Sequence, residues 1–548
     1  MRMALTRGLP FAAVDVSATA DSGTILAMTR ERVSQRGTSL ALSAADQSRR
    51  SAQHGILTAG TTRQGNRQGP AVALPRGLET GQRFSLPFSW AALGPFFAWL
   101  AFGALIAATA AIAVYAAAQP SILVPRSTAA FPGWLAGPLH GLFGSLPHSR
   151  GALEFGLSAV LVGMTIAYVI ALLAVRTVSM RALWIVVGVL MALLLVTPPL
   201  QLTDLFNYLG YARLGGLHGL NPYTHVIGEI RRDPIYLFST WHGLHSPYGE
   251  LFTALTYPLA FLSLPVATWI FKVAAVLASV GILWLVAVCA RRLGRDPRLA
   301  VAFVGLNPVF LVYAIGGFHV DLFMLLASTA AVALFLSRRD RTAGALMMVA
   351  FGIKVTGLLL LPFMLVAARK GRRRLHLVMG AVLAAVPLAA LSISLFGLTF
   401  SNVFDQSHIL TQLSIPNLLG LAVGAGGGTQ AVLRGMEVLV VAVAVYQLVR
   451  MAMQPDRDWL AGAGWVTLAL VASAPWLMPW YVIWLLPLAA LARRTSLRAV
   501  AVALTLFLVL TLGPDTTYVF NRNNINLLQT PAGRASMTLE HKLVSGPK

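Results

Sequence analysis

The sequence predicts an all-α protein that crosses a membrane many times. Hydrophobic residues make up 57% and charged residues 11% of its 548 residues, against about 25% charged residues in soluble domains. Its mean hydropathy is +0.72. From about residue 90 to 513 the chain is a series of apolar runs, several with the ~20 residues that a spanning helix needs. Short arginine-rich segments separate the runs, as the positive-inside bias predicts for cytoplasmic loops. The net charge of +23 therefore does not indicate a nucleic-acid partner, and we expect a helix bundle in a lipid bilayer.

The first segment, residues 1–88, is different. It is rich in Ser, Thr, Gln, Arg and Gly and has no sustained apolar period or signal peptide, so we expect a disordered, basic cytoplasmic tail. The same composition would fit translation from a start codon upstream of the native one. The single cysteine, Cys289, excludes an intramolecular disulfide and leaves the compartment undefined.

Residues 89–513 are expected to form the transmembrane domain. Arginine clusters assign the sides of the runs: the first leaves the cytoplasm, an outer loop follows at 119–152, and a polar C-terminal tail at 514–548 lies outside. The runs expected to span are 90–118, 153–175, 182–201, 266–290, 299–315, 321–337, 375–397, 428–450, 459–474 and 498–513. With two half-spans and a returning segment after residue 474, the bundle has about 11–13 transmembrane helices.

The half-spans follow from the charges around residues 342–368. Both flanks are basic, SRRDR (337–341) and ARKGRRR (368–374), so both ends should be cytoplasmic. The segment is too short to cross twice at full length, so we expect it to turn near IKVT (353–356). Lys354 is then a lone cation deep in apolar sequence, and it should face a polar cavity reached from outside.

One polar stretch, residues 201–253, interrupts the apolar pattern. It carries Asp204, Arg213, Asp233 and four histidines (His218, His225, His242 and His245). Asp204 follows the apolar run 181–200, and a carboxylate at the exit of a membrane helix is a functional candidate; the alternative is a helix-capping residue. The segment 246–265 is short and interrupted by prolines, which favours an interfacial or re-entrant helix that completes an outer catalytic loop at 201–265.

Several unusual polar residues fall on the same side in this topology. GGFHVD (316–321) forms an outer turn that carries His319 and Asp321, and Lys354 lies at the outer tip of the half-spans. Another outer turn near residue 479 carries Trp476, Trp480 and Tyr481. Together with the outer loop, these segments predict a single site at the outer interface.

A carboxylate beside cations at a membrane surface suits transfer from a phospholipid-linked donor. A departing phosphate needs cations to take its charge, and the acceptor hydroxyl needs one base, for which Asp204 would serve. A glycosidase instead needs two facing carboxylates. The residues therefore favour glycosyl transfer over hydrolysis.

Five segments between residues 180 and 490 carry a family resemblance. They are TDLFNYLGYARLGGLHGLNPY (203–223), HSPYGEL (245–251), GGFHVD (316–321), AGALMMVAFGIKVTGLLLLP (343–362) and PWYVIWLLPL (479–488). In this order they resemble the GT-C superfamily of polyprenyl-phosphate-dependent glycosyltransferases. The similarity is greatest to the bacterial mannosyltransferase branch that includes mycobacterial lipomannan and phosphatidylinositol-mannoside enzymes.

The resemblance implies a GT-C-like bundle with Asp204 as catalytic base in the first major outer loop. It implies inverting transfer of a hexose, mannose in this branch, from a polyprenyl-phosphate donor to an envelope glycan or glycolipid, without a nucleotide sugar, a cofactor or an obligatory metal. The enzyme would be a multi-pass protein of the bacterial inner membrane with its active site on the periplasmic face. Val320 stands where family members commonly have a polar residue.

Further residues are candidates for binding the donor phosphate or sugar, each with a structural alternative. Lys354 would pair with the phosphate or line a cavity. His319 and Asp321 would bind substrate, or hydrogen-bond the backbone of their own turn. Arg213 would contact phosphate or pair with Asp204, and Tyr248 would stack on a sugar or fix a turn.

Three aromatic and imidazole side chains complete the set. Trp480 and Tyr481 are candidates for the substrate site, with an interfacial belt as the alternative for the tryptophan. His245 is expected at a polar rim or in contact with the donor. With His242 it makes only two potential zinc ligands, and a structural or catalytic zinc site needs three or four, so no metal site is predicted. Asp233 follows two arginines, which indicates a solvated charge run.

The alternative function is a transporter or flippase of lipid-linked glycans, with intramembrane charges lining a pathway. Arg434 and Glu437, three residues apart in the run 428–450, would be its best charged pair, as an i,i+3 pair inside the bundle. We find no internal repeat of the kind that transporters often show, and the charges gather at one face. A non-catalytic scaffold is a third possibility, against which the cluster around Asp204 argues.

Overall fold

The computed structural model describes residues 90–144, 146, 149–398, 408–454 and 456–547. All of these residues belong to one compact unit. The tail expected at 1–88 lies outside the described residues. Residues 399–407 of the predicted outer loop 398–427 also lie outside them. All regular structure in the described part of the chain is helical, which confirms the all-α prediction.

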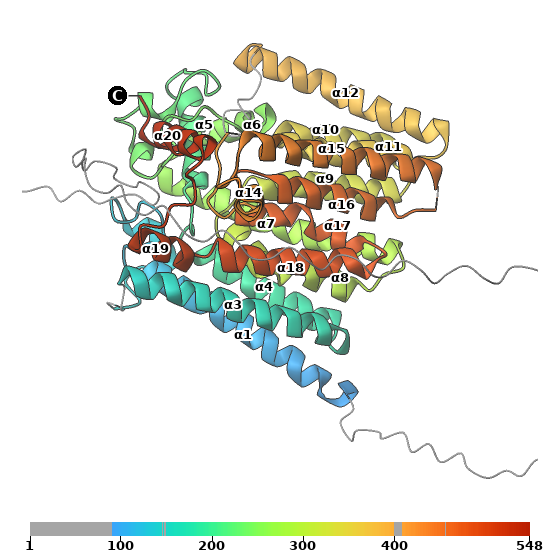
Figure 1. Ribbon diagram of the computed structural model, residues 1–548, viewed down its shortest axis with the longest axis horizontal. Coiled ribbons are helices and arrows are strands. Elements are labelled where there is room, and N and C mark those ends of the chain that lie inside the picture. Colours follow the sequence, from blue (N-terminus) through green and yellow to red (C-terminus); the bar gives the residue numbers. More distant parts are fainter. Residues whose placement is uncertain (1–89, 145, 147–148, 399–407, 455, 548) are drawn as a thin grey trace, which may run out of the picture. The chain divides into compact units, whose positions relative to one another are not determined.

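Six helices among the described residues are long and apolar enough to span a bilayer. Their axes run in similar directions in Figure 1. They are α1 (Trp90–Ala118), α3 (Arg150–Ala174), α7 (Leu264–Arg292), α12 (Gly371–Phe396), α15 (Gln430–Met453) and α18 (Thr495–Thr511) with its continuation α19 (Pro514–Arg522). Five shorter apolar helices accompany them. The chain is therefore a polytopic membrane protein.

The third predicted span is shorter than expected. Helix α4 (Met180–Val196) ends five residues before the predicted boundary at 201, because Pro198 and Pro199 follow and proline cannot continue a helix. Asp204 therefore begins a separate helix, α5 (Asp204–Gly216). Helix α5 packs against α6 (Glu250–Ala260), the short helix that the sequence predicts in the outer loop.

Three membrane segments are broken and reverse direction. In the first, α8 (Pro297–Gly305) leads to a π-helix (Phe310–Ile315), a tight turn and α9 (Asp321–Leu336). In the second, α10 (Asp340–Ile353) stops at Lys354, whose extended backbone (φ −155°, ψ 135°) leads to a 3₁₀-helix (Val355–Leu360) and α11 (Leu361–Ala367). In the third, α16 (Trp459–Ser473) leads to a 3₁₀-helix (Pro479–Trp484) and α17 (Leu486–Leu491). The second confirms the reversal predicted near 353–356.

The remaining elements lie in loops and in the C-terminal segment. They are α2 (Gly133–Ala136), four 3₁₀-helices (Gly137–Leu139, Val175–Thr177, Ile227–Glu229 and Pro234–Leu237), α14 (Ile415–Ala422) and α20 (Pro531–Ser545). Helix α20 packs on the outer loop, where the Gly243 amide donates to the Leu543 carbonyl over 2.7 Å. The polar C-terminal segment therefore lies on the same side as that loop and is largely helical.

Helices α12 and α15 are the least covered of the long helices, with 17% and 6% of their apolar windows buried. Arg434 and Glu437, on α15, are both exposed. The prediction that they pair inside the bundle is therefore wrong, because both side chains lie on an exposed face of α15.

Candidate functional site

Asp204 is the first residue of α5, and its carboxylate faces another segment of the chain. The N-cap position of this helix belongs to Thr203, so Asp204 is not its N-cap residue, as the alternative interpretation would have it. Its Oδ2 lies 3.1 Å from Nδ1 of His319, and the two side chains are 12% and 1% exposed. The start of a helix favours a carboxylate there, because the helix dipole is positive at this end.

The imidazole of His319 is buried without a hydrogen bond. Its ring is close to Asp204 but not aligned for one, and neither ring nitrogen has a hydrogen-bond partner among the described residues. Buried polar atoms are seldom left unsatisfied, and an exception calls for an explanation. A substrate hydroxyl or phosphate oxygen would provide such a partner.

Two residues in the left-handed region of backbone space flank this pair. Gln201 has φ 67° and Phe318 has φ 53°. The two loops are joined where the Leu200 amide donates to the Gly316 carbonyl over 2.9 Å. Non-glycine residues in this region carry strain, and such strain clusters at functional sites. Here the two residues lie three positions before Asp204 and one position before His319.

The second charged pair joins the tips of two broken segments. Lys354 Nζ donates to Asp321 Oδ1 over 2.8 Å, with side chains 17% and 1% exposed. The same oxygen accepts from Trp484 Nε1 over 2.6 Å. Asp321 is therefore a buried anchor that holds the lysine ammonium in place while the ammonium itself stays partly accessible.

Aromatic rings connect the two charged pairs. His319 stacks on Trp480 with centroids 3.9 Å apart and planes at 12°, and Tyr481 stacks on Trp484 at 4.6 Å and 23°. Residues three apart eclipse in a 3₁₀-helix, which is why Tyr481 and Trp484 face each other. Trp480 is 5% exposed, so its interpretation as an interfacial-belt residue is wrong.

Tyr248 belongs to an aromatic wall beside Asp204. Its ring meets Tyr208 edge-on at 4.8 Å and lies 6.1 Å from Tyr211. The Tyr208 hydroxyl accepts from the Val320 amide over 3.2 Å, so the outer loop is tied to the turn that carries His319. Val320 itself is fully buried and lies on the protein side of this turn.

A close backbone approach fixes the outer loop against the tip of the half-spans. The Gly249 amide donates to the Ile353 carbonyl over 3.0 Å. A Cβ on Gly249 would lie 2.1 Å from the Gly352 carbonyl oxygen, so only glycine fits here. This contact places Gly249, the residue after Tyr248, against Ile353, the residue before Lys354.

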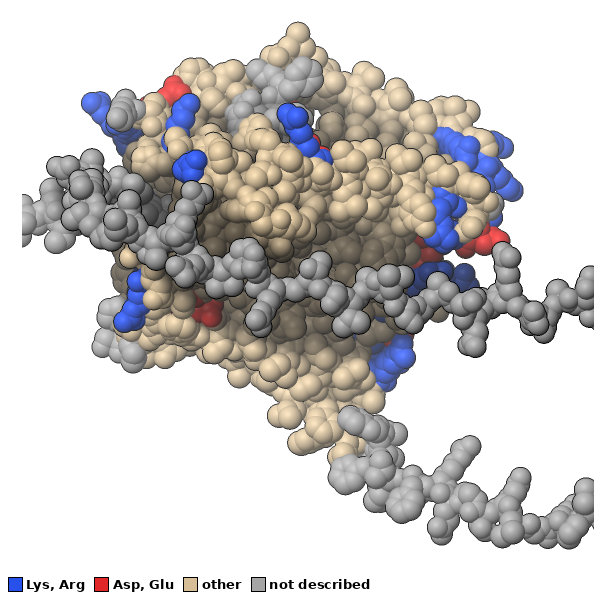
Figure 2. Space-filling model, viewed as in Figure 1, with Lys and Arg blue, Asp and Glu red and all other residues tan. Residues whose placement is uncertain are grey.

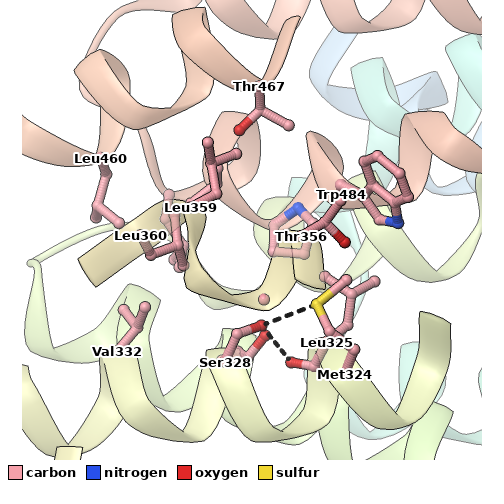
Figure 3. Close-up of a pocket in the computed structure, with 15 residues that line it drawn as sticks. Met324, Leu325, Ser328, Val332, Thr356, Leu359, Leu360, Leu460, Thr467 and Trp484 are labelled. Carbon is pink, nitrogen blue, oxygen red and sulfur yellow. Dashed lines mark hydrogen bonds between the residues drawn. The ribbon is translucent and has the colours of Figure 1, made fainter. Parts of the chain in front are cut away.

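A small, mostly apolar pocket of about 40 Å³ adjoins this cluster. Its walls come from α9, the 3₁₀-helix at 355–360, α16 and α17, and Figure 3 shows Trp484, Thr356, Ser328 and several leucines around it. Ser328 uses its hydroxyl on the Leu325 carbonyl. Thr356 Oγ1 is buried and has no hydrogen-bond partner within the described part of the chain.

Arg213 and Asp233 form a separate pair inside the outer loop. Arg213 Nε donates to Asp233 Oδ1 over 2.8 Å, and His218 Nε2 lies 2.9 Å from Oδ2. Burial raises the pKa of Asp233, but the hydrogen bonds from Arg213 and His218 outweigh it and the net pKa lies below its usual value. The expected solvated charge run at Asp233 is therefore wrong, and Arg213 does not pair with Asp204.

His242 and His245, the pair considered as zinc ligands, lie in different surroundings. No group of three or more metal-binding side chains occurs among the described residues. His242 stacks on Tyr236 with centroids 3.8 Å apart and planes at 8°. His245 is half-buried beside Leu244, whose carbonyl accepts from the Tyr211 hydroxyl, at the edge of the aromatic wall.

Burial of His242 makes the stability of the fold depend on pH. It lowers the pKa of His242 to about 4; the hydrogen bonds to the Tyr236 and Ser239 backbone oppose this shift, and the nearby Arg126 and Arg231 charges add to it. The unfolded chain, with a pKa near 6.5, takes up the proton first, so this residue destabilises the fold as pH falls from about 6.5 to 4. We expect the melting temperature to fall over this range.

A matched variant isolates the contribution of His242. His242→Phe keeps an aromatic ring against Tyr236 but cannot be protonated. Melting curves at pH 7, 6 and 5 should show a smaller loss of stability on acidification in this variant than in the wild type. Equal losses would mean that other groups cause the acid sensitivity.

Two residues of this region were missed by the sequence analysis. Trp484 lies in the quoted segment 479–488, but one tryptophan among several gave no signal that its indole would bond Asp321. Lys272, in α7, is 1% exposed and lies 4.0 Å over the Trp269 ring and 5.4 Å from that of Phe318. A lysine inside the apolar run 266–290 can be seen in the sequence, and an ionisable residue within a membrane segment is a candidate functional residue.

Comparisons with known proteins agree with this architecture. The family profile described as alpha-(1->6)-mannopyranosyltransferase, N-terminal domain, matches residues 101–370, and that described as MptB C-terminal domain matches residues 411–530. The first thus covers the outer loop, His319, Asp321 and Lys354. No solved structure matches the chain significantly.

Similar proteins carry the same name. Alpha-(1->6)-mannopyranosyltransferase A of Mycobacterium tuberculosis is 26% identical over 364 residues, which cover 60% of this chain and 69% of that protein. Alpha-(1->6)-mannopyranosyltransferase B of Corynebacterium glutamicum is 26% identical over 368 residues, which cover 58% of this chain and 60% of that protein. The two profiles together cover most of the described chain, and the chain belongs to the alpha-(1->6)-mannopyranosyltransferase family of membrane glycosyltransferases.

Proposed function

We propose that this protein transfers a mannosyl residue from a polyprenyl-phosphate donor to a hydroxyl group of an envelope glycan or glycolipid. The observation that carries the proposal is the joined cluster of Asp204, His319, Asp321 and Lys354. It combines one accessible carboxylate with one anchored cation, which is the set that transfer from a phosphate leaving group requires.

Asp204 would act as the general base. It would take the proton of the acceptor hydroxyl as the acceptor oxygen attacks C1 of the sugar, while the C1–O bond to phosphate breaks. The polyprenyl phosphate leaves with the bonding electrons, so no acid is needed on that side. Attack opposite the leaving group inverts C1, and an α-linked product, as in the names of the relatives, would then require a β-linked donor.

Lys354 would take the charge of the departing phosphate. Its ammonium has three donors, and Asp321 occupies one of them. The aromatic rings of Tyr481 and Trp484, 5.4 and 5.0 Å from Nζ, exclude water on one side and strengthen the electrostatic interaction. The unpartnered nitrogens of His319 would contact the sugar or the phosphate between the two charged pairs.

The surroundings suit a lipid-linked donor. The apolar pocket in Figure 3 is lined by Thr356, two residues after Lys354 in the chain, and by Trp484, which bonds the same Asp321 oxygen as Lys354. It would lie on the path of the first hydrocarbon units of the carrier. Tyr248 and Trp480 offer ring faces on which a sugar would stack. Arg213 is engaged with Asp233, so we assign it to holding the outer loop; His245, at the rim, remains a candidate for donor contact.

The distribution of charges supports an assignment of the cluster to one side of the membrane. The ends of α7 and α11 that lie away from Lys354 lead to the basic residues Arg291, Arg292 and Arg369. This distribution supports a cytoplasmic assignment for that end and an extracytoplasmic, periplasmic location for the cluster.

The test is sugar transfer by the purified protein in lipid nanodiscs. Labelled polyprenyl-phospho-mannose would be offered with an envelope-glycolipid extract as acceptor, and a nucleotide-linked mannose would be the matched donor control. We expect transfer from the lipid-linked donor alone and an α linkage in the product. Transfer from the nucleotide sugar, or movement of intact glycolipid across the bilayer without transfer, would contradict the proposal.

A further inference from the structure

A second pocket lies at the other end of the helices, away from Asp204 and Lys354. It is an open pocket of about 350 Å³ between the end of α11, the start of α12, the end of α15 and the start of α16. Arg369, Arg374 and Arg457 line it together with apolar side chains. Figure 2 shows lysine and arginine side chains gathered at the end of the bundle where α11 and α12 join in Figure 1.

The three guanidinium groups are held by the protein but only partly neutralised. Arg374 Nε donates to the carbonyls of Leu365 and Ala368, and Arg457 Nε donates to Gln454 Oε1 over 2.8 Å. The terminal Nη groups of these two arginines have no hydrogen-bond partner within the described part of the chain. They are therefore positioned and available for an anion.

One carboxylate faces the three cations. Arg369 Nη2 lies 3.4 Å from Asp456 Oδ1, and the Asp456 side chain is fully exposed, where an ion pair contributes little. Asp458, the next acid along the chain, is engaged with Arg295 and with the Arg493 amide. The pocket therefore keeps an excess of positive charge.

The other walls are apolar, and they continue onto exposed helix faces. Val366, Met451 and Trp459 line the pocket. Beside it, Leu375 on α12 is 58% exposed and Met453 on α15 is 76% exposed, on the two long helices with the least protein cover. A soluble anion would not use such surfaces, whereas the hydrocarbon chains of a lipid would lie along them.

We propose that this pocket binds the phosphate headgroup of an anionic phospholipid, with its acyl chains along α12 and α15. Guanidinium groups bind phosphate oxygens in pairs, and basic pockets between helices on the cytoplasmic side are known sites for anionic headgroups. The lipid would join the end of α11 to α15 and so brace the broken segment whose other end carries Lys354. This site does not depend on the proposed transfer activity.

The test is native mass spectrometry of the purified full chain with phosphatidylglycerol and, as the zwitterionic control without net charge, phosphatidylcholine of the same chain length. We expect one firmly held phosphatidylglycerol. R374Q/R457Q should weaken it on the order of 25-fold, from about fivefold per arginine near a charged surface. R374K/R457K keeps the charges and should be intermediate.

The control variant removes two charges from the same end of the protein outside the pocket. Arg341 and Arg372 are exposed and do not line it, and residues two apart on a helix, such as 372 and 374, do not face each other. R341Q/R372Q should therefore leave the tightly held lipid in place. An equal loss in this control would mean diffuse attraction to the basic end and would overturn the site.

The remaining outcomes separate a lipid from a free anion and from loss of the fold. Displacement of phosphatidylglycerol by inorganic phosphate, or equal retention of phosphatidylcholine, would overturn the assignment to an anionic phospholipid. A loss in R374K/R457K as complete as in R374Q/R457Q would mean that the pocket had collapsed and that charge does not hold the ligand.

Discussion

Asp204→Asn should abolish most of the transfer while leaving the donor bound. The substitution keeps the size of the side chain and removes the base, and loss of a general base costs about 10²–10⁴-fold in rate. Lys354, Asp321 and Trp484 are untouched, so donor affinity should change little. Turnover and binding of polyprenyl-phospho-mannose, measured on the same nanodisc preparation, would separate the two effects.

Asp233→Asn is the matched control for this variant. It removes a carboxylate from the same outer loop, but one that is paired with Arg213 and His218 away from the cluster. We expect a lower melting temperature and unchanged turnover per folded molecule. Full turnover by Asp204→Asn would remove Asp204 from the chemistry and direct attention to Asp321.

Lys354→Met should lose both stability and donor binding. It leaves the Asp321 carboxylate, 1% exposed, without its cation, and removing one partner of a buried pair costs about 3–5 kcal/mol. The indole of Trp484 would still donate to Asp321 but cannot neutralise it. The melting temperature should fall clearly, and the donor should bind weakly to the molecules that remain folded.

The double variant K354M/D321N separates structure from function. A neutral amide at 321 can still accept from Trp484, so most of the lost stability should return. Donor binding should not return, because the cation for the phosphate is absent. If the double variant bound donor as the wild type does, Lys354 would be a structural residue only.

The fold of this protein was predictable where one physical signal dominates. Long apolar runs located α1, α7 and α15, and basic residues on both sides of 342–368 predicted the break at Lys354. The early end of α4 could also be predicted from the sequence, because two consecutive prolines follow it. The helical structure of α20 was hidden, because its composition is polar and its apolar side is visible only against the outer loop.

The candidate site was predictable as a set of segments but not as a set of contacts. Topology placed Asp204, His319, Asp321 and Lys354 on one side, and the structure brings them together. Which carboxylate pairs with which cation depends on tertiary packing: Arg213 meets Asp233 twenty residues away. The 3₁₀ geometry at 479–484 changes which aromatic rings face inward, so Trp484 could not be distinguished from its neighbours by a helical period.

The contact between α20 and the outer loop has a consequence for the order in which the protein is made. Gly243 bonds to Leu543, 300 residues later in the chain, and Arg231 bonds to the Pro547 carbonyl. The loop that begins with Asp204 leaves the ribosome early, yet it cannot complete its packing until α20 has been synthesised and moved to the same side of the membrane. During synthesis the nascent protein therefore carries an incompletely packed outer loop, and a polypeptide fused directly to the C-terminal segment would compete with the contact that completes it.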